Sequence, residues 1–297
     1  MTGRMAGKVS FITGAGRGQG RAHAVLQAHE GADIIAVDIC EDIESNPYPM
    51  ASWDDLIETK RLVEKEGRTC VAVKADVRKR DQLSAALDQG LAELGPLTTV
   101  MANAGILPLA MGDPQPMDFQ DAVDVDLVGV MNTVAVSVPH LLSAGNGGSI
   151  IITGSTAALI PNTTNSTNDP RTIMGPGGAG YSWSKQALVG YTQEMANHLA
   201  SSGIRVNVVH PTNCNTPLMN NPGIYAVFRP DLQGPVSKED FQMASVFYHA
   251  LPTGWIEPQD VAEVVLFLAS DASKYMTGTS IPIDAGCMVK WPNGPGQ

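Results

Sequence analysis

The segment Val9–Val25, VSFITGAGRGQGRAHAV, decides the fold. An apolar, β-branched run ends at Thr13, a glycine-rich turn follows, and a helical pattern begins directly after the turn. Glycines between a strand and a helix let the backbone approach a pyrophosphate, whose charge then faces the free N–H groups of the helix start. The segment therefore predicts a dinucleotide site. The residues expected to contact the dinucleotide are Gly14, Arg17, Gly18, Gln19 and Gly20.

The same alternation of a short apolar run and a helical stretch recurs along the chain. It predicts an α/β fold, a doubly wound sandwich, because buried parallel strands read as continuous apolar runs. We expect one Rossmann-type domain over residues 1–297, with a central parallel sheet of about seven strands and helices on both faces. The expected strands are Val9–Thr13, Asp33–Val37, Thr69–Lys74, Thr98–Ala102, Ser149–Thr153, Ile204–His210 and Ser280–Asp284.

Composition narrows the range of partners. The chain contains 30 acidic and 19 basic residues, a net charge of −11, and no basic block, which argues against nucleic acid and anionic membrane surfaces. The four cysteines are far apart and the six histidines do not cluster, so we expect no metal site and a cytoplasmic location. The first residues lack an apolar stretch of signal-peptide length, and we expect neither export nor membrane insertion.

Asp38 lies at the end of the second expected strand. A carboxylate there accepts hydrogen bonds from the ribose hydroxyls of NAD and repels the 2′-phosphate of NADP. Arg17 in the glycine turn favours a phosphate, but its side chain is free to point to solvent. We therefore expect NAD as the cofactor.

Tyr181 and Lys185 are four residues apart in GYSWSKQAL, so a helix places both on one face. A cation beside a phenol stabilises the phenolate and lowers the pKa of the tyrosine. Such a tyrosine takes a proton from an alcohol or returns it to a carbonyl. Ser155 follows the expected strand Ser149–Thr153 and is placed to hydrogen-bond the substrate oxygen. The three residues predict interconversion of an alcohol and a ketone.

Together these motifs resemble the short-chain dehydrogenase/reductase family over essentially the whole chain. TGAGRGQG is similar to the family's cofactor motif, and Ser155, Tyr181 and Lys185 match its catalytic set. The resemblance implies that Lys185 also binds the nicotinamide ribose and that the subunits form a homotetramer. It implies further cofactor contacts at Asp76, Val77, Asn103, Ala104, Gly105, Pro211, Cys214 and Thr216.

Shorter segments resemble a narrower branch of the family, the mycofactocin-associated, carveol dehydrogenase-like enzymes. One of these segments is an insertion near residues 40–51, which contains NPYPMA. The others are GQGRAHAV, HPTNCNTPL and FRPDL. The resemblance implies NAD held without ready exchange, for which the extra loop is a rationale. An external redox acceptor is then implied as a partner.

The sequence departs from the family's pattern at three places. Asp126, in VDVDLVGV, stands at the fourth catalytic position, where the family has Asn, and Thr212 stands where it usually has Gly. Ser155 and Tyr181 are further apart than usual, which predicts an insertion near residues 161–180. We expect this insertion to border the pocket and to change shape with ligand. The glycines expected to act as its hinge are Gly175, Gly177, Gly178 and Gly180.

Residues 213–250 carry prolines and aromatics and are expected to roof the substrate pocket. Met219, Tyr225 and Phe228, with Ser155 and Tyr181, are the expected substrate contacts. The apolar roof predicts a small hydrophobic secondary alcohol, alicyclic or terpenoid, such as carveol. Two alternatives stay open. One is a non-catalytic NAD-binding sensor or scaffold with the same fold, and the other is the dehydratase/epimerase branch, which shares Tyr-x-x-x-Lys but has a different glycine pattern.

Overall fold

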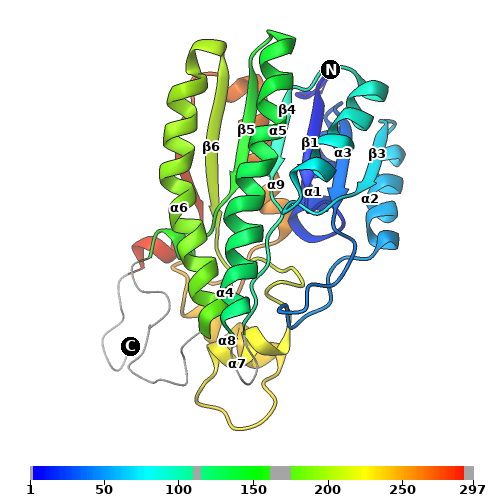
Figure 1. Cartoon of the computed structure of the whole chain (residues 1–297). Coiled ribbons are helices and arrows are strands. Elements are labelled where there is room, and N and C mark those ends of the chain that lie inside the picture. Colours follow the sequence, from blue (N-terminus) through cyan, green and yellow to red (C-terminus); the bar gives the residue numbers. More distant parts are fainter. Residues whose placement is uncertain (1–2, 110–114, 161–174, 291–297) are drawn as a thin grey trace.

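Seven parallel strands form the central sheet of the part of the chain that the structure describes. This structure is a computed structural model, and it describes residues 3–109, 115–160 and 175–290 (Figure 1). The strand order β3-β2-β1-β4-β5-β6-β7 is that of a doubly wound Rossmann fold. The predicted fold and strands are confirmed, with bounds that agree to within one residue. The strands are β1 (Val9–Thr13), β2 (Asp33–Asp38), β3 (Cys70–Lys74), β4 (Thr99–Ala102), β5 (Gly148–Thr153), β6 (Ile204–Pro211) and β7 (Ser280–Ile283).

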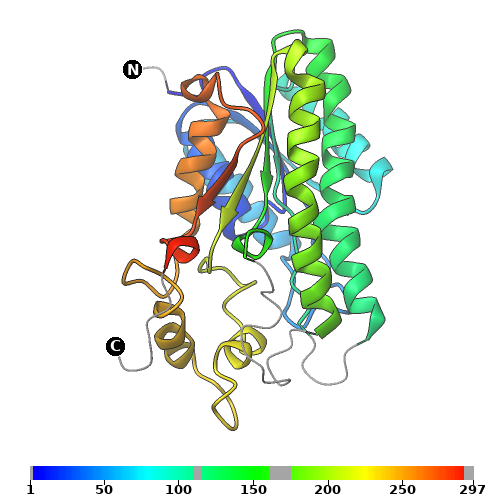
Figure 2. The ribbon, with the colours of Figure 1, turned by 90° about the vertical axis from the view of Figure 1, so that its left-hand side faces the viewer.

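Helices cover both faces of the sheet. Helices α1, α2 and α9 form one apolar core with one face, and α3, α5 and α6 form a second core with the other. Figure 2 shows α6 and the continuous helix of α4 and α5 on one side of the sheet and α9 on the other. The helices are α1 (Gly18–His29), α2 (Trp53–Lys65), α3 (Arg80–Leu94), α4 (Pro116–Val123), α5 (Gly129–Ala144), α6 (Gly175–Leu199), α7 (Pro222–Phe228), α8 (Lys238–Val246) and α9 (Pro258–Ala269).

Helices α4 and α5 are joined by a π-helical turn, Asp124–Val128. Their combined span, Pro116–Ala144, is the one described helix that is long and apolar enough to cross a membrane by length and composition. Side chains such as Val130 and Val134 are buried in the core, which accounts for its apolar character. A single π turn changes the phase of the helix, and such turns recur at functional sites. Here Asp126 lies in the turn with none of its surface exposed.

The glycines predicted to form a hinge belong to the first turns of α6, and the change of shape with ligand stays a prediction. A Cβ at Gly177 would lie 1.8 Å from the carbonyl oxygen of Pro108, and one at Gly180 would lie 2.7 Å from that of Phe119. These glycines therefore allow close packing of α6 against neighbouring backbone. Residues 161–174 of the predicted insertion lie outside the described residues.

The buried histidine of α1 makes the stability of the fold sensitive to acid. His23 has no exposed surface, and burial lowers its pKa to about 3 from an ordinary 6.5. Below pH 6.5 the unfolded chain therefore takes up the proton first. The stability that neutral His23 contributes is complete above pH 6.5 and falls towards pH 3, by about 1.4 kcal/mol per pH unit.

We expect His23→Met to reduce the acid sensitivity of the free energy of unfolding. Between pH 7 and pH 5, urea unfolding should show a loss of stability about 2 kcal/mol smaller in His23→Met than in the wild type. His29→Gln is the control, because exposed His29 bonds to Glu66, which raises the pKa of His29. That variant should keep the acid sensitivity. An equal loss in His23→Met and the wild type would contradict the assignment.

Candidate active site

A cavity of about 420 Å³ lies at the carboxyl ends of the strands, where open parallel sheets bind their ligands. It brings together most of the residues predicted for the site. Those lining it are Gly14, Arg17, Gly18, Gln19, Asp38, Asp76, Val77, Asn103, Ala104, Gly105, Asp126, Ser155, Tyr181, Lys185, Pro211, Cys214, Thr216, Met219 and Phe228. Gly20 and Tyr225 are not part of the lining.

The glycine turn forms one end of the cavity. Gly14 and Gly18 have positive φ angles of 67° and 57°, which other residues rarely adopt. A Cβ at Gly20 would lie 2.0 Å from the carbonyl oxygen of Gly14, so Gly20 allows α1 to pack on the turn instead of lining the cavity. The side chain of Arg17, the residue before α1, does not cap the start of the helix. Its first N–H groups are therefore available to an anion in the cavity.

Asp38 closes the cavity at the end of β2. Its Oδ2 accepts a hydrogen bond from the backbone N–H of Gly16 at 2.8 Å. Burial raises the pKa of this carboxyl group, and backbone hydrogen bonds from Gly16 and Cys40 counteract the rise. Arg17 is partly exposed, and its guanidinium donates a hydrogen bond to the carbonyl oxygen of Pro49.

The loop of residues 40–51 covers part of the cavity. Ile43 and Tyr48 line the cavity and are buried, and the Ser45 hydroxyl donates to Oδ2 of Asp121 at 2.7 Å. The Tyr48 hydroxyl accepts a hydrogen bond from the N–H of Leu107 at 3.3 Å. The loop therefore reaches from the Asp38 end of the cavity to the segment after β4.

Two of the predicted cofactor contacts hold the walls of the cavity in place. The Asn103 amide donates to the carbonyl oxygen of Thr13 at 3.1 Å, and its Oδ1 accepts from the Thr153 hydroxyl at 3.1 Å. Asn103 thus ties together the ends of β1, β4 and β5. The Asp76 carboxylate pairs with the Arg78 guanidinium at 2.8 Å.

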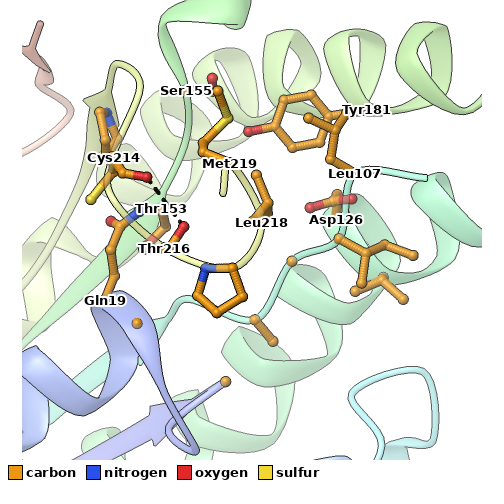
Figure 3. Close-up of a pocket in the computed structure, with 18 of the residues that line it drawn as sticks. Gln19, Leu107, Asp126, Thr153, Ser155, Tyr181, Cys214, Thr216, Leu218 and Met219 are labelled. Carbon is orange, nitrogen blue, oxygen red and sulfur yellow. Dashed lines mark hydrogen bonds between the residues drawn. The ribbon is translucent and has the colours of Figure 1, made fainter. Parts of the chain in front are cut away.

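Tyr181, Lys185 and Ser155 all line the cavity, and Figure 3 shows Tyr181 and Ser155 in it. The Lys185 Nζ lies 5.5 Å from the centre of the Tyr181 ring and donates to the carbonyl oxygen of Thr153 at 3.0 Å. A side-chain hydrogen bond links Ser155 with the Tyr181 hydroxyl. His210 is buried behind them, with its Nδ1 2.9 Å from the carbonyl oxygen of Ser155, so it supports the serine.

The pKa of the Tyr181 phenol is raised, against the direction predicted from Lys185 alone. Burial of the phenol is the largest cause, and the negative charge of Asp126 adds to it. Lys185 and the hydrogen bond from Ser155 act in the opposite direction. The phenol is therefore the favoured form at neutral pH.

Asp126 forms a buried ion pair with Lys185, with 3.2 Å between Oδ1 and Nζ. Burial raises the pKa of Asp126 to about 6, and Lys185 opposes the rise. A Cβ at position 105 would lie 2.6 Å from this Oδ1, so Gly105 makes room for the carboxylate.

The segment Pro211–Thr216, which includes the end of β6, forms the side of the cavity facing the glycine turn. The Thr216 hydroxyl donates to the carbonyl oxygen of Cys214 at 3.3 Å, a bond drawn in Figure 3. A Cβ at Gly18 would lie 3.2 Å from the Thr216 methyl group. The segment and the turn are thus close neighbours across the cavity.

Helices α7 and α8 lie together below the sheet in Figure 1 and carry the apolar end of the cavity. Met219 and Phe228 line it as predicted. The prediction that Tyr225 lines the cavity is wrong. Its ring centre lies 5.3 Å from that of Phe241, and the neighbouring Ile224 lines the cavity instead. Tyr225 supports the roof from behind.

Sequence reasoning missed several lining residues. Leu107 follows the turn Asn103–Gly105 closely, and this position could have indicated it. No pattern in the sequence indicated the others, because they lie in an insertion or within and beside the short helices α7 and α8, whose phase the sequence leaves open. Among the missed residues are Tyr48, Leu107, Leu218, Ile224, Val227 and Tyr248.

Comparisons with known proteins agree with this geometry. The family model described as enoyl-(acyl carrier protein) reductase matches residues 14–288. A (−)-trans-carveol dehydrogenase from Rhodococcus erythropolis is 41% identical over 97% of this chain and 99% of its own length. The crystal structure of carveol dehydrogenase from Mycobacterium avium in complex with NAD has a TM-score of 0.87 and 42% identity, covering 97% of this chain and 100% of that one.

A short chain dehydrogenase from Mycobacterium paratuberculosis, in a crystal structure bound to NAD, is 41% identical and has a TM-score of 0.82. That likeness covers 96% of this chain and 99% of the other. The matches extend over nearly the full length of both partners, and they include the strands and turns that carry the site. The chain belongs to the short-chain dehydrogenase/reductase family.

Proposed function

We propose that the protein is an NAD-dependent oxidoreductase that interconverts a hydrophobic secondary alcohol and its ketone. The observation that carries the proposal is the convergence of Ser155, Tyr181 and Lys185 on a cavity that also contains the glycine turn. The same convergence argues against a non-catalytic sensor or scaffold, which needs no such set. Names of similar proteins, carveol dehydrogenase among them, support the activity.

The residues of the cavity fit NAD. The uncapped start of α1 suits the pyrophosphate, and Gly14 and Gly18 leave space where side chains would stand. Asp38 suits the ribose hydroxyls of NAD and opposes a 2′-phosphate. NAD is also bound in the structures of two similar proteins. When bound, NAD supplies the hydride acceptor for alcohol oxidation.

In this mechanism Tyr181 is the general base for alcohol oxidation and the general acid for ketone reduction. Its hydroxyl takes the proton of the substrate hydroxyl or returns it. Lys185 stabilises the phenolate by its charge, and in this proposal it also binds the nicotinamide ribose. Ser155 orients the substrate oxygen through the hydrogen bond that it shares with Tyr181.

The apolar end of the cavity supports an alicyclic or terpenoid substrate. Its core is the buried cluster of Leu107, Leu109, Ile224, Tyr225 and Phe241. Met219 and Phe228 pack against this cluster and line the cavity. An apolar enclosure favours a substrate that loses little hydration on entering it.

A homotetramer remains the expected assembly, and exposed apolar side chains on α5 and α6 support it. Met131, Leu142 and Trp183 are 41%, 46% and 53% exposed.

The cysteines are unpaired, which supports the expected cytoplasmic location. The buried anchors Ile43 and Tyr48 of the loop 40–51 support slow NAD exchange, and with it an external redox acceptor of the mycofactocin-associated kind.

The decisive experiment is native mass spectrometry of the protein as purified, followed by a panel of alcohols. The panel is assayed with and without added NAD and with artificial dye acceptors. Bound NAD and oxidation of alicyclic alcohols would support the proposal. NAD binding without oxidation of any alcohol under either condition would favour the sensor or scaffold.

Tyr181→Phe should lower kcat by at least about 10², the usual minimum for the loss of a general acid or base. The aromatic ring and its packing are kept, so NAD binding should be unchanged. Steady-state kinetics and NAD titration test the two statements. Turnover close to that of the wild type would remove Tyr181 from the mechanism.

Asp126→Asn should shift the pH dependence of alcohol oxidation to lower pH. Asp126, with a pKa of about 6, is ionised where Tyr181 loses its proton, and its charge raises the pKa of Tyr181. Removing that charge lowers the pKa of Tyr181. The rate, which rises with pH as the phenolate forms, should then rise at a lower pH. The pH profile of kcat/KM for alcohol oxidation measures the shift when hydride transfer limits the rate.

Asp124→Asn is the matched control for this change. Asp124 lies in the same π-helical turn, and its carboxylate accepts a hydrogen bond from Gln120 at 2.8 Å. Its replacement removes one negative charge from the turn but leaves the pair of Asp126 and Lys185. The control should keep the wild-type profile, and an apparent pKa that is unmoved or raised in Asp126→Asn would refute the electrostatic role.

A further inference from the structure

Two consecutive residues of the segment Pro211–Thr216 are bound to the roof by buried side-chain hydrogen bonds. Thr212 and Asn213 both line the cavity and are 7% and 8% exposed. The Thr212 Oγ1 lies 2.8 Å from Nε2 of His249, which follows α8 and is 2% exposed. Thr212 stands where the family usually has glycine, which has no side chain to make this bond.

The surroundings of His249 fix the direction of its bond with Thr212. The Nδ1 of His249 lies 2.7 Å from the carbonyl oxygen of Thr253, which can only accept, so Nδ1 carries the hydrogen. Burial lowers the pKa of His249 and keeps the ring neutral. Nε2 is therefore an acceptor, and the Thr212 hydroxyl donates to it.

Asn213 makes the second link. Its amide donates to the Ser245 hydroxyl of α8 at 2.7 Å, and Ser245 has no exposed surface. The Ser245 hydroxyl in turn donates to the carbonyl oxygen of Gly254. The main chain of Asn213 is held as well, since its carbonyl oxygen accepts from the N–H of Ile256 at 2.9 Å.

The part of the chain reached by these bonds also shapes the substrate end of the cavity. Ala244 of α8 and Tyr248 just after it line the cavity. Phe241, at the start of the same face, is fully buried and packs edge-on against Phe228 at 4.9 Å between ring centres. A displacement of α8 would therefore move the walls of the substrate site.

We propose that the bonds Thr212–His249 and Asn213–Ser245 form a tether through which the cofactor side of the cavity and the substrate roof move as one body. His249 and Ser245 are positioning residues in this proposal, which rests on the proposed cofactor site. In this proposal, NAD binding restricts the motion of Pro211–Thr216. The two hydrogen bonds of the tether then restrict the motion of α8. Two binding sites that favour the same state of one structural element are energetically coupled. Binding at one site then changes the affinity at the other, typically by fivefold or more.

Hydrogen exchange of α8 with and without NAD tests the tether. In the wild type, saturating NAD should slow amide exchange in residues 238–249 by about fivefold or more. Thr212→Val keeps the shape but removes the donor, and should abolish most of that gain. Thr212→Ser restores a hydroxyl and should recover it. Alcohol KM should rise about fivefold in Thr212→Val with a smaller change in kcat.

Ser237→Ala is the matched control for a loosened roof. The Ser237 side chain caps α8 by accepting from the N–H of Asp240, so its loss weakens the helix without touching the tether. Exchange in α8 should be faster in this variant, and the slowing by NAD should persist. Thr212→Val that still shows the wild-type slowing would overturn the proposal, as would a wild type that binds NAD without any slowing.

A double-mutant cycle separates failure of the tether from failure of the proposed function. Thr212→Val and His249→Phe should each speed α8 exchange without NAD, and the double variant should be no faster than the faster single one. Additive effects would overturn the tether whether or not NAD binds. Absence of NAD from the purified protein in native mass spectrometry, together with absence of NAD binding in calorimetry, would refute the proposed cofactor and leave the cycle to decide on the tether.

Discussion

The buried ammonium group of Lys185 is the constraint around which the site is organised. A charge with 2% of its residue exposed needs partners, because an unpaired buried charge is strongly destabilising. The carbonyl oxygen of Thr153 supplies one partner from the end of β5, and Asp126 supplies the other from the π-helical turn. Gly105 is small because the carboxylate occupies the space of its side chain. The end of β5, the π-helical turn and Gly105 thus all accommodate the charge of Lys185, and Tyr181 lies beside it.

The sequence predicted the sheet well because buried parallel strands are apolar along their whole length and each is bounded by turn residues. It also predicted the elements of the site that are local in sequence, the glycine turn and the pair Tyr181 and Lys185. It could not predict that Arg17 bonds to Pro49 or that Tyr48 reaches Leu107, since these contacts depend on how a distant loop folds back. In α7 the sequence predicted Tyr225 as a lining residue, whereas its neighbour Ile224 lines the cavity. The direction of the pKa shift of Tyr181 depends on burial, which the spacing of Tyr181 and Lys185 does not encode.

The two ends of the cavity follow different physical rules. Around the glycine turn the chain offers backbone N–H groups and the carboxylate of Asp38, and directional hydrogen bonds there select a cofactor atom by atom. Around α7 and α8 it offers aliphatic and aromatic surface, which selects by shape and by hydration. Ser155 and Tyr181 stand where the two regions meet. A molecule with one polar atom at that border and an apolar body beyond it would match both regions.

The bonds of Thr212 and Asn213 have a consequence for chimeric enzymes. The roof looks like a separable module, because α7 and α8 follow the last residues of the cofactor wall in one continuous stretch. A graft that begins after Thr216 would combine a new α8 with the old Thr212 and Asn213, and the donors would face side chains selected for other neighbours. A graft that begins before Pro211 and continues past Gly254 carries both ends of each bond together. The natural boundary for exchanging substrate preference in this chain therefore lies inside β6, upstream of the pocket itself.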